Sequence, residues 1–210
     1  MIEVHHLNNS RSQRVLWLLE ELQLPYTIVP YQRDATTNLA PPSLKAIHPL
    51  GKSPVIRDGD RVVAKSAAIL EYIVEHHGKG ALAPARDAAS IERHRYWMHY
   101  AEGSLMTPFL LKLYLGRVGE PARALLERIE GQIRTHLSFV EEQLGDASYF
   151  VGNALTAADI QMSFPLELAD TQKLLEGSFP RLKQWVTRMH ARPAYRRALE
   201  KGGPYAFAKD

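Results

Sequence analysis

The spacing of apolar residues over the first eighty positions alternates between the period of strands and the period of helices. Short runs rich in β-branched residues predict four strands, over residues 2–6, 26–30, 55–57 and 61–64. Apolar residues at helical spacing predict three helices, over residues 12–23, 43–47 and 66–76. Asp58 and Gly59 lie between the last two strands, as expected for a hairpin. The predicted order of elements is β-α-β-α-β-β-α.

The rest of the chain has helical period throughout. One long helix is expected to have an apolar face formed by Leu125, Ile129, Ile133, Leu137, Val140 and Leu144. A later helix has an apolar face formed by Leu182, Trp185, Val186 and Met189. Residues 156–170 are apolar on nearly all sides, which predicts a buried central helix. We therefore expect an α+β domain over residues 1–80, a linker over 81–87 that follows two glycines and contains a proline, and an all-helical domain over 88–210.

The central helix begins with a capping box in the segment LTAADI, from Leu155 to Ile160. Thr156 can cap the N–H of Asp159, and the Asp159 carboxylate can accept from the N–H of Thr156 in return. Because this role holds the carboxylate in a buried, capped position, we interpret Asp159 as structural rather than catalytic.

Composition narrows the chemistry available to the chain. Its 210 residues carry a formal net charge of +3 with both signs in nearly every segment, so no nucleic-acid partner is predicted. The absence of cysteine excludes disulfides, thiolate zinc sites and a cysteine nucleophile. The histidine pairs at residues 5–6 and 76–77 lack the i,i+4 spacing of helical metal ligands, so no metal site is predicted.

No targeting or membrane segment is expected. The start of the chain, MIEVHHLNNSRSQR, lacks the apolar core of a signal peptide. No apolar run reaches the roughly 18 residues that a membrane span needs. We therefore expect a cytoplasmic protein with no membrane span.

The segment HPLGKSPVI places Pro54 directly before a predicted strand. Proline has no N–H for a ladder and is confined to edges, bulges or the start of a strand. A cis bond before Pro54 would form a tight turn. We expect this turn to leave the backbone of Ser53 free to pair with a ligand.

Four short strings occur in order along the chain: LGKSPVI around Pro54, KSAAILEYI from Lys65, LTAADI around Asp159 and RPAY from Arg192. Together with the predicted element order, they resemble the glutathione S-transferase superfamily over almost the whole chain. The longer strings NSRSQRVLWLLEEL, VPYQRDA, APPSLKAIHPLG, EGSL and MSFPLELA are similar to the yeast transferase I type group, which has bacterial members. The resemblance implies a thioredoxin-like first domain followed by a helical bundle. It also implies a homodimer that uses glutathione as co-substrate, without a metal, in detoxification.

The resemblance assigns the chemistry to the loop NNSRSQR, between the first strand and the first helix. Ser10 occupies the position of the serine that holds the glutathione sulfur as a thiolate in serine-type classes. A hydroxyl donor and the free N–H groups of a helix N-terminus favour an anion there. Two alternatives remain: Ser12 is the catalytic serine, or the serines only cap the helix.

The resemblance also implies a binding site for the glutathione tripeptide. The backbone of Ser53, before cis-Pro54, pairs with the cysteinyl backbone as an added strand. Lys52 is suited to the glycine carboxylate and Ser66 to the γ-glutamyl carboxylate at a helix N-terminus. Without the resemblance, Lys52 is an ordinary turn residue and Ser66 an ordinary cap. Lys65 departs from the family, which usually has Glu or Gln there.

A second, apolar pocket for an electrophile is expected from Arg11, Tyr100, Met106, Phe109 and Tyr114. The alternative is that the apolar members of this set belong to the core. Pro108 is expected to kink the helix that carries them. In the EGSL string, Glu102 is expected either to contact glutathione bound to a partner subunit or to lie on a solvated face.

The predicted function is conjugation of the glutathione thiolate to small, largely apolar electrophiles. A glutathione-dependent peroxidase or disulfide reductase is a second hypothesis. A third, from another class, is a non-catalytic transferase-fold protein that binds or regulates.

Overall fold

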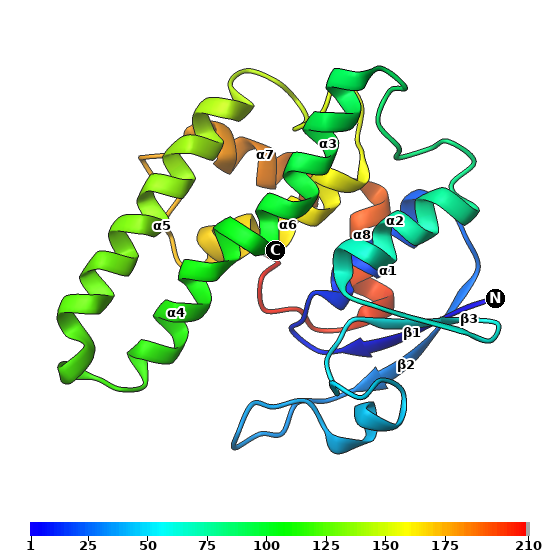
Figure 1. The fold of residues 1–210 in the computed structure, drawn as a ribbon, viewed down its shortest axis with the longest axis horizontal. Helices are drawn as coiled ribbons and strands as arrows, with labels where there is room; N and C mark the ends of the chain where they lie inside the picture. The colour runs from blue at the N-terminus through cyan, green and yellow to red at the C-terminus, as the bar shows by residue number, and fades with distance from the viewer. Residues whose placement is uncertain (209–210) are drawn as a thin grey trace. The chain divides into compact units, whose positions relative to one another are not determined.

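The structure is a computed structural model that describes residues 1–208 (Figure 1). The chain forms two compact units. The first contains residues 1–83 together with the chain from residue 187 onward, and the second contains residues 84–186. The predicted domain limits at residues 80 and 88 stay predictions, but the segment after residue 186 groups with the first unit.

The first unit contains one four-stranded sheet in the order β2-β1-β3-β4. Its strands are β1 (Ile2–Leu7), β2 (Tyr26–Tyr31), β3 (Val55–Asp58) and β4 (Arg61–Ala64). β1 runs parallel to β2 and antiparallel to β3, and β3 and β4 form the predicted hairpin. The helices are α1 (Ser12–Glu21) and α2 (Ser66–His77). The predicted fold class, α+β followed by an all-helical part, is confirmed.

The helix predicted over residues 43–47 is instead a 3-10 helix, Pro42–Ala46. Five residues are too few for a stable α-helix, and the tighter 3-10 turn is common in such short connections. Pro41 and Pro42 also remove two N–H donors at its start. Only Leu44 of this segment is buried.

β1 is an inner strand, and it carries polar side chains that are buried on both of its faces. Successive side chains of a strand alternate between faces, so His6 shares a face with Ile2 and Val4 while His5 shares the other with Glu3. Both histidines are at most 5 % exposed. The alternation therefore gives these adjacent histidines different surroundings.

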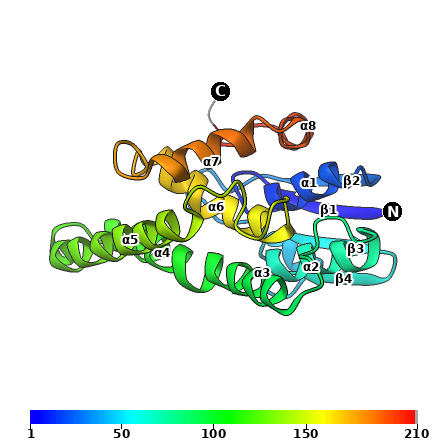
Figure 2. The ribbon, with the colours of Figure 1, turned by 90° about the horizontal axis from the view of Figure 1, so that it is seen from above.

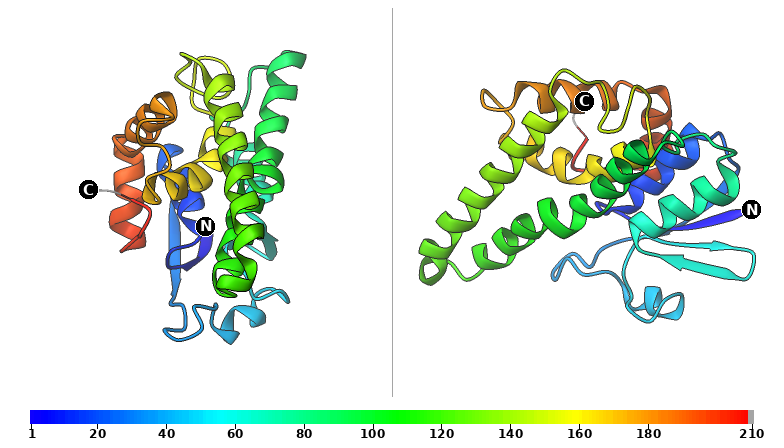
Figure 3. Two further views of the ribbon diagram at one scale, coloured as in Figure 1. Left: turned by 90° about the vertical axis from the view of Figure 1, so that its left-hand side faces the viewer. Right: turned by 45° about the horizontal axis from the view of Figure 1, so that its top comes forward.

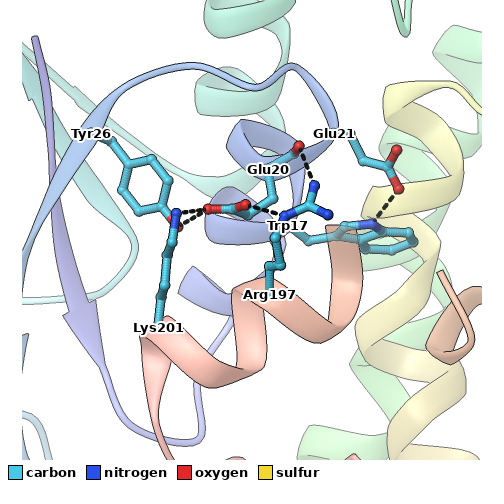
Figure 4. Close-up of polar contacts among 6 residues, drawn as sticks. All are labelled: Trp17, Glu20, Glu21, Tyr26, Arg197 and Lys201. Atoms are coloured by element: carbon cyan, nitrogen blue, oxygen red, sulfur yellow. Dashed lines mark hydrogen bonds and ion pairs between the residues drawn. The ribbon is translucent and has the colours of Figure 1, made fainter. Parts of the chain in front are cut away.

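The C-terminal helix α8 (Pro193–Gly202) packs along α1 and is joined to it by buried carboxylates (Figure 4). The Glu20 carboxylate, 6 % exposed, accepts from the Tyr26 hydroxyl and from Nε of Arg197, each at 2.8 Å, and forms an ion pair with Lys201. Next to it, Glu21 accepts from the Trp17 indole at 2.8 Å. Nε of Arg192 also donates to Glu21, at 2.6 Å. We call the Glu20 and Glu21 contacts the carboxylate clasp.

The second unit is helical, as predicted. It contains α3 (Ala88–Tyr100), a π-helical turn (Ala101–Leu105), α4 (Met106–Gly116), a 3-10 turn (Glu120–Ala122), α5 (Arg123–Leu144) and α6 (Ala157–Thr171). α7 (Pro180–His190) crosses the limit between the units. α4 and α5 run side by side as an antiparallel pair (Figure 3), and α6 lies between α7 and the layer of α3, α4 and α5 (Figure 2).

The predicted apolar face of α5 is buried except at its first residue. Ile129, Ile133, Leu137, Val140 and Leu144 are buried, whereas Leu125 is 46 % exposed. Leu125 lies in the first turn of α5, at the end of the α4 and α5 pair that is far from α6 (Figure 1). Helical period identifies the apolar face of a helix, but how far the core extends along that face depends on the neighbouring helices.

The irregular backbone near Pro108 lies before the proline rather than at it. Proline lacks the N–H that would bond to the carbonyl four residues earlier, at Ser104. The chain forms a π turn at Ala101–Leu105 in this region. The Thr107 hydroxyl donates to the Gly103 carbonyl at 3.2 Å, so a backbone carbonyl of this turn has a side-chain donor as its partner.

The predicted capping box of α6 is confirmed. The Asp159 carboxylate, which is fully buried, accepts from the N–H of Thr156 at 2.9 Å and from the N–H of Phe150 at 2.8 Å. Burial raises the pKa of Asp159 to about 6, although these hydrogen bonds act in the opposite direction. The predicted central position of α6 is confirmed as well, because nearly all of its residues are buried.

Among residues 1–208, no helix is both long enough and apolar enough to cross a membrane.

The carboxylate clasp generates a stability prediction. Glu20→Gln should lower the free energy of unfolding by about 1–3 kcal/mol, because it removes charged hydrogen bonds from a buried group. Burial alone raises the pKa of Glu20, but hydrogen bonds from Lys201, Arg197 and Tyr26 outweigh it and lower the pKa below its ordinary value of 4.5. The stabilisation is therefore complete above pH 4.5 and is lost as the pH falls through the lowered pKa.

Denaturant titrations of wild type and Glu20→Gln over this acid range measure the difference. Glu200→Gln, on the exposed side of α8, is the matched control and should be neutral. A difference between wild type and Glu20→Gln that does not shrink in acid contradicts the prediction.

Candidate functional site

The loop between β1 and α1 carries Ser10 and Ser12, and we call it the serine loop. It is held in place by hydrogen bonds with other segments of the first unit. Asn9 has a positive φ of 49°, and its side-chain oxygen accepts from the N–H of Ala206 at 2.7 Å. The backbone N–H of Arg33 donates to Oδ1 of Asn8 at 2.8 Å, and Nε of Arg33 donates to the Asn8 carbonyl at 3.1 Å. The sequence analysis did not identify Arg33 as part of this site. Its position just after β2 could have indicated that it lies near the loop after β1, because parallel strands end at the same edge of a sheet.

Ser10 and Ser12 are joined to each other in this loop. Their hydroxyl oxygens lie 2.8 Å apart, and Oγ of Ser10 also accepts from the N–H of Ser12 at 3.2 Å. Oγ of Ser12 lies 2.8 Å from Nδ1 of His6 and 3.2 Å from the Leu7 carbonyl. Ser12 is fully buried and surrounded by these partners, whereas Ser10 is 4 % exposed. The geometry leaves Ser10 the better placed of the two serines to reach a ligand.

The capping alternative is realised only in part. No side chain caps α1 at its N-cap residue, Arg11. The Ser10 hydroxyl does take the N–H of Ser12, one of the first in the helix. Ser10 therefore satisfies one free donor of α1 and retains a second side that faces Ser53.

Ser53 precedes a cis peptide bond to Pro54, as expected. Its hydroxyl lies 3.3 Å from Oγ of Ser10 and donates to the His5 carbonyl at 3.3 Å. Regular pairing with β1 begins one residue beyond the proline, at Val55. Within residues 1–208, the backbone N–H and C=O of Ser53 form no hydrogen bond. Pro54 is buried, Ser53 is half-buried, and its free backbone lies beside the serine loop.

Ser66 begins α2 and is buried. Its hydroxyl accepts from the guanidinium of Arg14 at 3.2 Å and does not cap the helix. The first N–H groups of a helix have no partner inside it, so this N-terminus can accept an anion. Arg14, which is also buried, brings a positive charge close to the same point. Arg14 was not among the site residues predicted from the sequence, and neither was this contact.

Lys65 has a φ of 77° and a ψ of 125°, values that few residues other than glycine adopt. Strained backbone of this kind is concentrated at functional sites. The side chains of Lys65 and Lys52 are both exposed, and neither forms an ion pair with a residue in the described range. The structure thus joins Ser10 to Ser53 and Ser66 to Arg14, while the cations of both lysines have no ion-pair partner within residues 1–208.

His6 is a third residue of this region, after Arg33 and Arg14, that was not predicted from the sequence. Besides its contact with Ser12, its imidazole hydrogen-bonds the backbone of Gly202 in α8. A Cβ on residue 202 would lie 2.8 Å from a methyl carbon of Leu16 and 3.4 Å from Nε2 of His6. Only glycine therefore lets the end of α8 approach this closely. Adjacent histidines in a strand were a signal that one of them faces the helices.

The other predicted pocket residues are distributed as follows. Arg11 in the first unit is half-buried. In the second unit, Met106 and Phe109 are buried, and Tyr114 is 58 % exposed. The Tyr100 hydroxyl lies 2.7 Å from Nδ1 of His136.

Tyr100 also lines an open groove of about 550 Å³ on α3 and the π turn. Its other lining residues are Glu92, Arg95, Tyr96, His99, Gly103 and Ser104. Glu102 is half-buried in the π turn beside this groove. In the part of the chain that the structure describes, no three His, Asp or Glu side chains are grouped to hold a metal ion.

Comparison with known proteins gives consistent matches. The family model for the glutathione S-transferase N-terminal domain matches residues 10–76, and that for the C-terminal domain matches residues 97–193. Glutathione S-transferase 3 of Schizosaccharomyces pombe is 36 % identical over 96 % of this chain and 88 % of its own length. Glutathione S-transferase 1 of Saccharomyces cerevisiae is 35 % identical, over 96 % of this chain and 95 % of its own. The crystal structure of a glutathione S-transferase from Actinobacillus pleuropneumoniae has a TM-score of 0.89 and 32 % identity, covering 98 % of this chain and 94 % of that one.

The backbone of Lys65 generates a prediction that can be checked without a ligand. Lys65→Gly should be more stable than Lys65→Ala by about 1 kcal/mol, because glycine adopts positive φ without the steric cost that any Cβ carries. Both variants lose the same charged side chain, so the comparison isolates the backbone. Thermal or denaturant unfolding of the two proteins measures the difference. Equal stability would show that the positive φ is not strained.

Proposed function

The chain belongs to the glutathione S-transferase family of enzymes, and we propose that it conjugates the thiolate of glutathione to small, largely apolar electrophiles, with Ser10 as the residue that holds the sulfur. The family is the one predicted from the short strings, and the yeast relatives agree with the narrower resemblance. The observation that carries the assignment of Ser10 is its position 3.3 Å from Ser53, whose backbone has no partner among the described residues. A sulfur next to Ser10 can therefore belong to a peptide that pairs with Ser53.

Each part of glutathione has a proposed partner. The N–H and C=O of Ser53 pair with the cysteinyl backbone, in the manner of strand addition. The N-terminus of α2, with Ser66 and the nearby charge of Arg14, binds the γ-glutamyl carboxylate. Lys52 binds the glycine carboxylate, and the cation of Lys65 adds attraction at the γ-glutamyl end. The two carboxylates and the peptide unit thus account for Lys52, Ser53, Lys65 and Ser66.

Thiolate formation alone explains little of the rate. A thiol with a pKa of about 8.5 is roughly 3 % ionised near pH 7, and lowering the pKa by about two units makes it about three-quarters ionised. The ionised fraction thus rises about 25-fold, but the lower basicity makes the thiolate roughly sixfold to tenfold less reactive at a Brønsted slope of about 0.4–0.5. The larger contribution must come from holding the thiolate next to the electrophile. Tyr114, which is exposed, is the proposed aromatic contact for the electrophile in the second unit.

Ser10→Ala should raise the pKa of the bound thiol, so that turnover falls most at low pH while the affinity for glutathione changes little. The pH dependence of kcat/KM with chlorodinitrobenzene, together with calorimetric titration of glutathione, tests this. Ser12→Ala is the matched comparison, because Ser12 is fully buried. If Ser12→Ala raises the thiol pKa and Ser10→Ala does not, the assignment is wrong.

The same assays separate the proposed reaction from its alternatives. Retention on glutathione resin without conjugation directs the search to peroxide and disulfide substrates, which this cysteine-free chain would reduce with bound glutathione alone. Failure to bind glutathione would favour a non-catalytic role.

We further propose a cytoplasmic homodimer that acts in detoxification, with Glu102 contacting glutathione bound to the partner subunit. Light scattering should give twice the chain mass of 23.7 kDa. Glu102→Gln should weaken glutathione binding without changing that mass. A monomer that binds and turns over glutathione normally would contradict both statements.

A further inference from the structure

A continuous hydrogen-bonded chain runs from Ser10 into the interior of the first unit. Oγ of Ser10 lies 2.8 Å from Oγ of Ser12, which lies 2.8 Å from Nδ1 of His6. The other side of the imidazole contacts the backbone of Gly202, on α8. All four residues are buried or half-buried. The chain therefore connects the proposed sulfur site to one buried base.

The Gly202 contact determines which nitrogen of His6 carries the proton. The hydrogen bond to the Gly202 backbone raises the pKa of His6, so the backbone group acts as an acceptor, which is the carbonyl, and Nε2, the nitrogen on the Gly202 side, is the donor. In the neutral imidazole Nδ1 is then an acceptor. The Ser12 hydroxyl can donate to the Leu7 carbonyl at 3.2 Å or to Nδ1 at 2.8 Å, and we assign its proton to the nearer Nδ1. Oγ of Ser12 is left to accept from the Ser10 hydroxyl. In the resting protein every proton of the chain thus points inward, away from the position proposed for the sulfur.

We propose that His6 takes up, through Ser12 and Ser10, the proton that the glutathione thiol loses. The inference rests on the proposed function, because it requires glutathione at Ser10. The S–H bond breaks and its proton binds Oγ of Ser10, while the Ser10 proton passes to Ser12 and the Ser12 proton to Nδ1 of His6. Each hydroxyl loses one proton and gains another, the sulfur becomes a thiolate, and the imidazole becomes imidazolium.

The transfer reverses the direction of every hydrogen bond in the chain. The Ser10 hydroxyl now carries the former thiol proton and donates it to the thiolate. His6 donates to Ser12, and Ser12 donates to Ser10. A single event therefore both ionises the thiol and turns Ser10 into the donor that stabilises the thiolate. The imidazolium gives up its proton to solvent after the conjugate has formed.

The surroundings of His6 suit a base that is neutral at rest. Burial lowers the pKa of His6, and the Gly202 hydrogen bond raises it by a smaller amount. The imidazole contacts the Ser12 hydroxyl and the backbone of Gly202, Gln13 of α1 lies beside the same glycine, and Pro30 pairs with His6 from β2. All of these are uncharged. The thiolate formed at Ser10 supplies the negative charge that stabilises the imidazolium.

Counting protons tests the proposal. Glutathione is mixed with the protein near pH 7 in weak buffer, and the thiolate is measured by its ultraviolet absorbance while a pH indicator measures protons released. In the wild type the thiolate formed should exceed the protons released, because His6 retains the difference. In His6→Phe the two quantities should be equal, and the thiolate fraction should fall about threefold, from about three-quarters to about one-quarter, as expected near pH 7 when the thiol pKa rises by about one unit.

Two further variants separate proton uptake from simple positioning. The amide of His6→Asn can hydrogen-bond Ser12 but cannot take a proton, so thiolate and released protons should be equal there too. His5→Phe is the matched control: His5 is equally buried on the same strand, faces the opposite side and bonds to the Tyr31 hydroxyl at 2.9 Å. It should retain the excess of thiolate. Circular dichroism and thermal unfolding check that each variant is folded.

The outcomes distinguish this inference from the proposed function. Wild-type protein that forms no thiolate with glutathione would overturn both. Thiolate that depends on Ser10 but equals the protons released would overturn the role of His6 alone. An excess that persists in His6→Asn would also overturn it, because that variant has no base at this position.

Discussion

The first unit depends on the carboxylates of Glu20 and Glu21, which are largely shielded from solvent and join α8 to α1. Burying Glu20 and Glu21 is costly unless both are paired and hydrogen-bonded. Three cations of α8 or its start, with the Tyr26 hydroxyl and the Trp17 indole, meet that requirement. The clasp joins residues that are more than 170 positions apart. Because the contacts are specific in geometry, they fix the position of α8 along α1 as well as its attachment.

The position of α8 along α1 also determines a second contact, between the end of α8 and His6 of β1. The clasp ends at Lys201, and the next residue is Gly202, which contacts His6 and Leu16. A shift of α8 along α1 would remove the carbonyl that fixes the protonation of the imidazole. The C-terminal helix thus belongs to the first unit in a chemical sense as well as a structural one. The charge of the clasp stays outside the direct contacts of His6, which are uncharged.

The site combines buried polar side chains with an unsatisfied backbone. Ser10, Ser12, His6 and Arg14 are buried and hydrogen-bonded. Ser53 offers free backbone groups beside them, and Lys65 holds a backbone conformation that is unfavourable for a residue with a Cβ. Preorganised groups of this kind lose little entropy when a ligand binds. The close packing of α1, whose apolar residues are fully buried, supplies the free energy that holds these side chains and backbone groups in place.

The sequence by itself determined what depends on neighbours along the chain. Alternation and helical period gave the four strands and the main helices, Pro54 gave the turn before β3, and Thr156 with Asp159 gave the start of α6. The serine loop and the start of α2 were identified by resemblance, and their local contacts depend on residues nearby in sequence. Only the tertiary structure decided that Leu125 is exposed, that Arg33 holds the serine loop, and that His6 meets Gly202. These facts depend on how far one helix extends along another and on the face of β1 that α8 approaches. Periodicity determines which face of an element is apolar, but the partner that covers it is chosen by packing between distant segments.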